Sequence, residues 1–270
     1  MAIDTGLTPP RAPAPGSVSA APDDADAERR FGGLRRLYGA AGYRQVRAAR
    51  IAVVGVGGVG SWCAEALARC GVAALVLIDL DHVAESNVNR QVQALGSTLG
   101  QPKVTALRDR IADIHPGCRV RAIEEFVDAG NWPGLLGEPV DVVIDACDAA
   151  PAKTAMAAWA LATRSNLVIV GAAGGKRVPH AVEVADLASV THDPLLASLR
   201  HRLRKQHEAP RAGNFGLSCV FSREAVAAPA DLCDTDGSLN CHGYGSSVVV
   251  TAAFAMAAAS VAMEFCLVKK

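Results

Sequence analysis

The sequence has no Cys-x-x-Cys pair, no excess of charge of either sign, and no apolar leader of the signal-peptide type. Its eight cysteines are scattered, which argues against a disulfide framework or a tetrathiolate zinc site and favours free thiols in a reducing cytoplasm. With 27 Lys+Arg and 27 Asp+Glu, the net charge does not indicate a nucleic-acid partner. The first 28 residues are rich in Pro, Ala and Asp, so we expect residues 1–28 to be a disordered tail.

The remainder of the chain is apolar enough to bury a full core, since half of its 270 residues are hydrophobic. Strand-type and helix-type segments alternate along it. The expected strands are 51–54, 74–78, 119–126, 140–146 and 167–171, and the expected helices are 61–70, 101–114 and 152–164. This alternation predicts an α/β fold, a Rossmann-like, doubly wound and mostly parallel sheet with an added antiparallel or irregular C-terminal part.

A glycine run joins the first strand to the first helix. Its glycines are Gly55, Gly57, Gly58 and Gly60. Glycine lets the backbone turn sharply and approach a phosphate, and the free N–H groups of a helix start favour an anion. Asp79 and Asp81 follow the second strand about 20 residues on, where a carboxylate can accept hydrogen bonds from ribose hydroxyls. The pattern predicts a nucleotide site, although a GxGxxG motif alone also fits NAD-dependent oxidoreductases.

The polar residues that follow the acidic pair indicate which kind of nucleotide site this is. Asn87, Arg90 and Gln91 come just after the acidic pair, and Lys103 lies in the first turn of the next expected helix. A lysine there is poorly matched to the helix dipole, so we expect a compensating anion. Together with Asp148, which follows the fourth strand, these cations form a pocket suited to a triphosphate and a metal ion.

After Gly171 the pattern changes, and we expect residues 176–245 to form a substrate-specific extension with a strand near 178–184. Its main feature is a basic cluster. The cluster comprises Arg200, Arg202, Arg204, Lys205 and Arg211. On a helix it would lie opposite an apolar face. It is either a solvated helix face or a phosphate-backbone contact, because a local cluster can bind RNA in a neutral protein.

Residues 246–270 form an expected apolar C-terminal helix. Its hydrophobicity makes membrane insertion marginal, and its many small side chains suit close packing against a sheet. We therefore expect a buried helix in a cytoplasmic protein, with peripheral or C-terminal membrane association as the alternative.

Five motifs in order resemble the adenylation core of the ThiF/MoeB class, which is related to ubiquitin-activating enzymes. They span residues 55–61, 78–81, 87–91, 100–103 and 145–148. Within that class, residues 30–33, 36–39, 213–222 and 241–245 are similar to the tRNA threonylcarbamoyladenosine dehydratase branch. The resemblance implies an ATP-binding adenylation core over residues 29–175.

The resemblance also implies roles for single residues. Gly57 and Gly58 would line the phosphates and Asp81 would hold the ribose. Arg90 and Lys103 would contact phosphates and, with Asp148 as the Mg²⁺ ligand, form the catalytic set. Gly55, Gly60, Asp79, Asn87 and Gln91 complete the expected nucleotide site.

Two family features are missing from this chain. The N-terminal arginine that related enzymes supply from a partner subunit is replaced by Gly33, which leaves Arg30 and Arg36 as substitutes. The paired Cys-x-x-Cys zinc ligands of many relatives are also missing. Cys219, Cys233 and Cys241 are either a partial metal set or ordinary thiols, and their spacing favours thiols.

The resemblance implies ATP-dependent cyclisation of threonylcarbamoyladenosine in tRNA through an acyl-adenylate, a net dehydration. It further implies a homodimer, with cysteine desulfurase or sulfur-acceptor proteins as additional partners. The alternatives are adenylation of the C-terminus of a ubiquitin-like sulfur carrier, an NAD-dependent oxidoreductase, and a non-catalytic nucleotide-binding scaffold.

Overall fold

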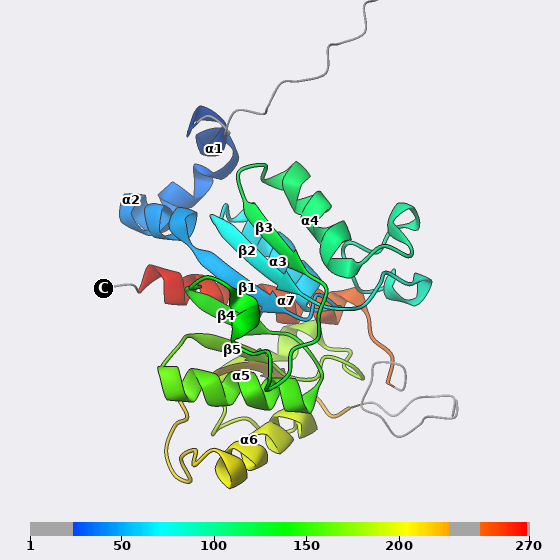
Figure 1. The fold of residues 1–270 in the computed structure, drawn as a ribbon, viewed down its shortest axis with the longest axis vertical. Coiled ribbons are helices and arrows are strands. Elements are labelled where there is room, and N and C mark those ends of the chain that lie inside the picture. The colour runs from blue at the N-terminus through cyan, green and yellow to red at the C-terminus, as the bar shows by residue number, and fades with distance from the viewer. Residues whose placement is uncertain (1–23, 227–243, 269–270) are drawn as a thin grey trace, which may run out of the picture.

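The computed structural model describes residues 24–226 and 244–268, and it places a seven-stranded sheet at the centre of the molecule (Figure 1). The sheet has the order β3-β2-β1-β4-β5-β7-β6, and only the β6–β7 pair is antiparallel. The strands are β1 (Arg50–Val54), β2 (Ala74–Ile78), β3 (Arg119–Ile123), β4 (Val142–Asp145), β5 (Leu167–Val170), β6 (Val182–Asp186) and β7 (Ser218–Ser222). The predicted mostly parallel α/β fold with an antiparallel C-terminal part is confirmed.

Helices cover both faces of this sheet. They are α1 (Asp24–Phe31), α2 (Gly33–Ala48), α3 (Gly60–Arg69), α4 (Lys103–Ile114), α5 (Ala150–Thr163), α6 (Pro194–Gln206) and α7 (Val248–Leu267), with 3₁₀ turns at Glu85–Asn87, Gly96–Thr98, Gly134–Leu136 and Pro179–Ala181. The end of α2 packs with α3, α4 and α7 on one face, and α5 and α6 pack on the other. Figure 1 shows α5 and α6 side by side below the sheet.

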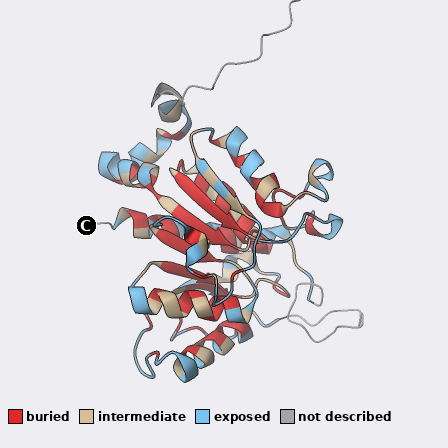
Figure 2. Cartoon of the chain, viewed as in Figure 1, coloured by how far each residue is buried: buried red, intermediate tan, exposed pale blue. Residues whose placement is uncertain are grey.

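The central strands are apolar on both sides because both faces are covered. In β1, Ile51 and Val53 point into the core beneath α3 and α7, whereas Ala52 and Val54 point toward α5. Figure 2 shows the consequence, a block of buried strands enclosed by helices that are exposed on their outer surfaces. Continuous β-branched runs such as 51–54 therefore predicted strand positions well.

The strand order reverses between β1 and β4. From β1 the chain proceeds outward through α3, β2, α4 and β3, and β4 then pairs with the other side of β1, with Val54 opposite Asp145. In open α/β sheets a ligand crevice forms at such a switch point, beyond the carboxyl ends of the strands. The glycine run after β1 and Asp148 after β4 therefore lie at the same edge of the sheet.

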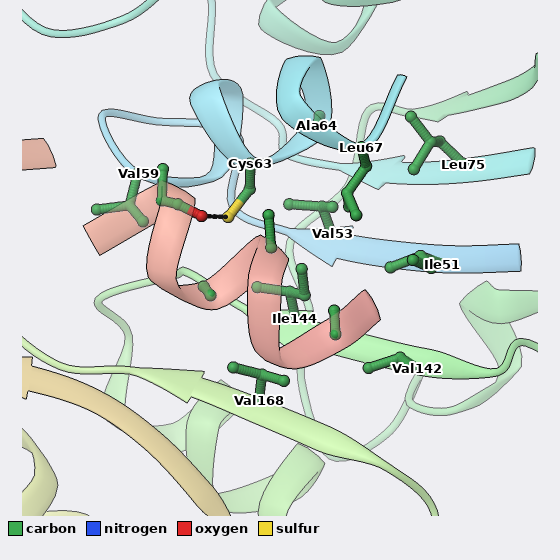
Figure 3. Packing of buried hydrophobic residues seen from close by; sticks show 14 of the residues in the cluster. Ile51, Val53, Val59, Cys63, Ala64, Leu67, Leu75, Val142, Ile144 and Val168 are labelled. Carbon is green, nitrogen blue, oxygen red and sulfur yellow. Dashed lines mark hydrogen bonds between the residues drawn. The ribbon is translucent and has the colours of Figure 1, made fainter. Parts of the chain in front are cut away.

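Helix α7 completes the core. By length and composition it could cross a membrane, with a mean hydropathy of 1.9, but half of that span is buried inside the molecule. The Cys63 thiol on α3 lies 3.1 Å from the Ala255 carbonyl of α7, and small side chains let the two helices approach closely (Figure 3). This packing matches the predicted buried helix and gives no support to membrane association.

Two boundaries differ from the expectations. Helix α1 begins at Asp24, inside the segment predicted as a disordered tail, and an Asp26–Arg30 ion pair of 2.8 Å links successive turns; residues 1–23 lie outside the described residues. Strand β7 arises in a stretch expected to be irregular. It inserts between β5 and β6, so the predicted extension is partly the edge of the same sheet.

Candidate active site

A cavity of about 820 Å³ opens at the carboxyl ends of the parallel strands. Nearly all the predicted nucleotide-site residues line it. They are Gly55, Gly57, Gly58, Asp79, Asp81, Asn87, Arg90, Gln91, Lys103 and Asp148. The structure thus brings together motifs that span almost one hundred residues of sequence, as expected for groups that follow neighbouring parallel strands.

The glycine loop, residues 55–60, forms one side of the cavity. Gly55 has φ +81°, and a Cβ there would lie 2.8 Å from the Cys147 backbone nitrogen, so both conformation and space require glycine. Gly60 does not line the cavity; a Cβ there would lie 1.8 Å from the Gly55 carbonyl. The loop leads into α3, whose N-terminus has no side-chain cap. Uncapped N–H groups at a helix start are suited to binding a phosphate.

Asp79 fastens this loop to the end of β2. Its carboxylate accepts hydrogen bonds from the backbone nitrogens of Val56 at 2.8 Å and Asp81 at 2.9 Å. Burial raises the pKa of Asp79, and the nearby Lys103 ammonium acts in the opposite direction. Asp79 therefore shapes the loop, while the more exposed Asp81 carboxylate faces the cavity.

Lys103 forms the strongest charged contact of the cavity. Its Nζ lies 2.7 Å from Asp81 Oδ2, with the lysine side chain 8% exposed and the aspartate 53% exposed. The Lys103 backbone nitrogen also donates to the Asp81 carbonyl at 2.9 Å, which ties the start of α4 to the end of β2. In this structure the anion that compensates a lysine at a helix start is Asp81.

Arg90 is held by its backbone. Its carbonyl accepts hydrogen bonds from Trp62 Nε1 on α3 at 3.0 Å and from Thr251 Oγ1 on α7 at 3.3 Å. Its guanidinium donates to the Ser86 carbonyl and to Asn89 Oδ1, at the cavity edge. Two helices from distant parts of the sequence thus position this cation beside the glycine loop.

The side-chain oxygens of the neighbouring amides accept hydrogen bonds from within the protein. Asn87 Oδ1 accepts the Ala84 N–H at 3.1 Å, and Gln91 Oε1 accepts from Gln93 Nε2 at 3.3 Å. Gln93 Nε2 also donates to the Val56 carbonyl at 2.9 Å, so a short polar chain connects Gln91 to the glycine loop.

Asp148 is exposed and lines the cavity from the β4–α5 connection. Carboxylate oxygens are preferred Mg²⁺ ligands. The described residues contain no cluster of three or more His, Cys, Asp or Glu that could hold a metal ion by themselves. A Mg²⁺ ion at this place would therefore bind one protein carboxylate together with phosphate oxygens, which is the common arrangement in nucleotide enzymes.

A buried ion pair below Asp148 escaped the sequence reasoning. Lys153 Nζ lies 3.0 Å from Asp145 Oδ1, both side chains are 0% exposed, and the same ammonium donates to the Val170 carbonyl of β5 at 2.8 Å. Burial alone would lower the pKa of Lys153, but the acidic neighbours Asp145, Cys147 and Asp193 together outweigh it and the pKa is raised. The pair links the ends of β4 and β5. The sequence signal for this pair was Lys153, a single lysine in an Ala-rich segment predicted to be helical.

The opposite side of the cavity, here called the β5 wall, consists of residues 170–174, 194–195, 244 and 246. Asp193, which is 3% exposed, joins two of these segments by accepting the N–H groups of Ala172 at 2.8 Å and Leu196 at 3.0 Å. The glycine loop, Asp79, Asp81, Arg90, Lys103 and residues 125–127 form the facing side, here called the β1–β3 wall.

The basic cluster divides into two groups. Arg200 donates to the carbonyls of Leu187 at 2.9 Å and Val190 at 2.8 Å, and Arg204 donates to the Pro210 carbonyl at 3.0 Å and lies over the Phe215 ring. These two arginines hold the α6–β7 region together. Lys205 and Arg211 are exposed and Arg202 is partly exposed. RNA contact by the cluster stays a prediction.

The remaining candidates lie away from the cavity or outside the described residues. Arg30 donates to Asp26 at 2.8 Å and to the Ile114 carbonyl at 3.1 Å, and neither it nor Arg36 lines the cavity. Cys219 is fully buried in β7, and burial raises the pKa of its thiol. Cys233 and Cys241 lie outside the described residues.

The chain belongs to the ThiF family, whose model matches residues 31–269. It is 37% identical over 249 residues to the tRNA threonylcarbamoyladenosine dehydratase of Haemophilus influenzae, covering 90% of this chain and 95% of that protein. The crystal structure of the Escherichia coli enzyme of that name, TcdA, in complex with ATP has a TM-score of 0.82 and 39% identity over 90% of this chain and 96% of its own. Its AMP complex has the same TM-score and 40% identity, covering 92% and 97%.

Proposed function

We propose that the protein catalyses the ATP-dependent dehydration of threonylcarbamoyladenosine in tRNA, which closes the threonylcarbamoyl group into a hydantoin-type ring. One observation carries the proposal: a single cavity collects the glycine loop, Arg90, Lys103 and the exposed Asp148. That set can bind and neutralise a triphosphate. Two relatives bearing this name, those of Haemophilus influenzae and Escherichia coli, are matched over 95–97% of their length, and the second was solved with ATP and with AMP.

The first step is activation of a carboxylate. An oxygen of the threonyl carboxylate attacks the α-phosphorus of ATP, the bond to pyrophosphate breaks, and an acyl-adenylate forms. The glycine loop and the start of α3 offer N–H groups to the phosphates, and Arg90 and Lys103 balance the charge that develops on them. Asp81 is placed to accept a ribose hydroxyl, so the nucleotide is held at both ends.

The second step needs no protein nucleophile. A nitrogen of the carbamoyl group attacks the acyl carbon, the bond to AMP breaks, and the nitrogen gives up its proton as the five-membered ring closes. The nucleoside loses one water overall. Positioning and charge neutralisation are sufficient for such an intramolecular attack. Cys147, the thiol that lines the cavity, has its pKa raised by burial and by the Asp145 carboxylate, which makes it a poor nucleophile.

Mg²⁺ would be bound by Asp148 together with the phosphates and would neutralise negative charge on the triphosphate. The exposed Lys205 and Arg211 and the partly exposed Arg202 are offered as contacts to the tRNA backbone. A homodimer and the participation of cysteine desulfurase or sulfur-acceptor proteins stay predictions. A cytoplasmic location fits an enzyme that acts on tRNA.

The experiment that tests this function measures AMP release with two carboxylate substrates and with one control that lacks the carboxylate. Purified protein, ATP and Mg²⁺ are incubated with tRNA carrying threonylcarbamoyladenosine, with the same tRNA lacking the modification, or with a ubiquitin-like sulfur carrier. We expect AMP only with the modified tRNA. AMP or pyrophosphate exchange only with the carrier would favour the alternative adenylation reaction, and the absence of nucleotide turnover would contradict adenylation altogether.

A further inference from the structure

Two phenyl rings line the cavity in the described part of the chain, and they lie on opposite walls. Phe126 follows β3 on the β1–β3 wall and is 64% exposed, and Tyr244 precedes α7 on the β5 wall and is 38% exposed. Aromatic side chains stabilise a fold mainly when they are buried, and these two exposed rings do not make that contribution in full. Their exposure beside a cavity suggests a ligand surface.

The backbone around Tyr244 is fixed although its ring is exposed. Asn89 Nδ2 donates to the Ser246 carbonyl at 2.8 Å, and the Val248 N–H donates to the Asn89 carbonyl at 3.0 Å. From the other side, the Gly175 N–H donates to the Gly245 carbonyl at 3.0 Å. The segment is therefore held between the residue next to Arg90 and the turn that follows β5. These contacts place the ring at the cavity without burying it in the core.

The turn after β5 lies beside this segment, at a separation that a Cβ on Gly174 would span with ordinary van der Waals contact. A Cβ on Gly174 would lie 3.7 Å from the Gly245 carbonyl and 3.9 Å from the Tyr244 Cβ. The loop after β5 and the segment around Tyr244 thus run beside each other along the β5 wall. The wall in this place is made of glycine backbone and one aromatic ring, which offers a flat apolar surface beside polar backbone groups.

The reaction defines what must lie near that surface. The threonyl carboxylate has to reach the α-phosphate beside the glycine loop and Arg90. In the modified nucleoside six bonds of about 1.3–1.5 Å, through N6, the carbamoyl group and one Cα, join the adenine ring to a carboxylate oxygen, a reach of at most about 7 Å. The modified base must therefore enter the cavity with its carboxylate, on the side that the nucleotide leaves open.

We propose that Tyr244 stacks on the modified adenine of the tRNA and so positions the threonyl carboxylate for attack. The inference rests on the proposed function. Sequence-specific RNA recognition commonly draws an unpaired base out of a loop and stacks it on an aromatic side chain. Stacking on a base needs only the face of an aromatic ring. A ring on a backbone segment held by hydrogen bonds is therefore sufficient for stacking, and the phenol hydroxyl is not required.

The test compares Tyr244→Leu with Tyr244→Phe and with Phe126→Leu. Steady-state kinetics are measured with modified tRNA at saturating ATP, and with ATP at saturating tRNA. Replacing a stacking ring weakens base binding, so Tyr244→Leu should raise the KM for modified tRNA at least tenfold while the KM for ATP stays within twofold. Tyr244→Phe should behave as the unchanged protein does. Phe126→Leu should affect the KM for ATP and spare that for tRNA.

Three results would overturn the proposal. One is an unchanged KM for modified tRNA in Tyr244→Leu. Another is an equal rise of both KM values with a lowered midpoint of thermal unfolding, which would make Tyr244 a structural residue. The third is a loss in Tyr244→Phe equal to that in Tyr244→Leu. A failure of the unchanged protein to convert modified tRNA would instead contradict the proposed function, so the two failures are distinguishable.

Discussion

The two walls of the cavity use charge in opposite ways. On the β1–β3 wall the Asp81 carboxylate of the Lys103–Asp81 pair is 53% exposed and the Lys103 side chain is 8% exposed, and both residues line the cavity. Beneath the β5 wall the Lys153–Asp145 pair is 0% exposed, and its other hydrogen bonds are to buried or partly buried protein groups, among them the Val170 carbonyl. An exposed pair can exchange its partner for a phosphate, whereas a buried pair is fixed by its desolvation. The Lys103–Asp81 pair can contact a ligand in the cavity, whereas the Lys153–Asp145 pair holds the ends of β4 and β5 together.

The largest effect should follow from breaking the buried pair. Lys153→Met leaves the Asp145 carboxylate buried without its cation, and Asp145 Oδ2 already has no hydrogen-bond partner in the described structure. We expect the free energy of unfolding to fall by about 3–5 kcal/mol. Urea denaturation followed by circular dichroism measures it. The double variant Lys153→Met/Asp145→Leu should recover part of the loss, and a loss below about 1 kcal/mol in the single variant would contradict the contrast between the walls.

Charged residues that line the cavity should affect catalysis more than stability. Lys103→Ala and Asp148→Ala remove groups that neutralise the triphosphate, and we expect kcat to fall about 10²- to 10³-fold, or about 2.7–4 kcal/mol of transition-state stabilisation. AMP release at saturating substrates measures this. Arg108→Ala is the matched control because it lies on the exposed surface of α4, paired with Asp109. Near-normal turnover in either site variant would remove that residue from the proposed mechanism.

A smaller effect is expected from the outward cations of α6 and the following loop. Replacing Arg202, Lys205 and Arg211 by alanine should weaken tRNA binding about tenfold and reduce the slope of log Kd against log salt by about 2–3. Filter-binding measurements of the tRNA Kd between about 50 and 300 mM salt test this prediction. Arg108→Ala again serves as control. An unchanged slope would mean that the cluster is a solvated helix face.

The smallest effect concerns a buried group remote from both walls. Burial lowers the pKa of His115 to about 4 from 6.5, with the Arg47 guanidinium 3.0 Å from its Nε2. Between these values the unfolded chain binds a proton that the folded chain does not. Stability should therefore fall by about 1 kcal/mol as the pH is lowered from 6.5 to 5.5. His115→Gln should abolish this contribution, as measured by urea denaturation at both pH values, with kcat unaffected. An equal pH dependence in both proteins would contradict it.

The sequence predicted the parallel part of the fold and the β1–β3 wall because both depend on local patterns. Strands β1 to β5 and helices α3 to α5 lie within a few residues of their expected positions, since buried runs and helix periodicity are short-range signals. Asp79, Asp81 and Asp148 were found because they follow parallel strands, and the residues from 87 to 103 were found from their spacing and from the family resemblance. Long-range features were missed. Strand β7 is defined by its neighbours β5 and β6, and the Lys153–Asp145 pair depends on how α5 packs.

The basic cluster shows the same limit. From the sequence its cations were equivalent, and the structure separates Arg200 and Arg204, which donate to backbone carbonyls, from the outward-facing residues. A run of charges predicts a polar surface, but the role of each side chain depends on the carbonyl groups that the fold brings within reach.

The most direct test of the central claim is nucleoside mass spectrometry of tRNA carrying threonylcarbamoyladenosine, after incubation with the purified protein, ATP and Mg²⁺. The account predicts that the modified nucleoside loses the mass of one water, that the loss requires ATP, and that AMP appears in equal amount. An unchanged nucleoside under conditions where the protein binds ATP would contradict it.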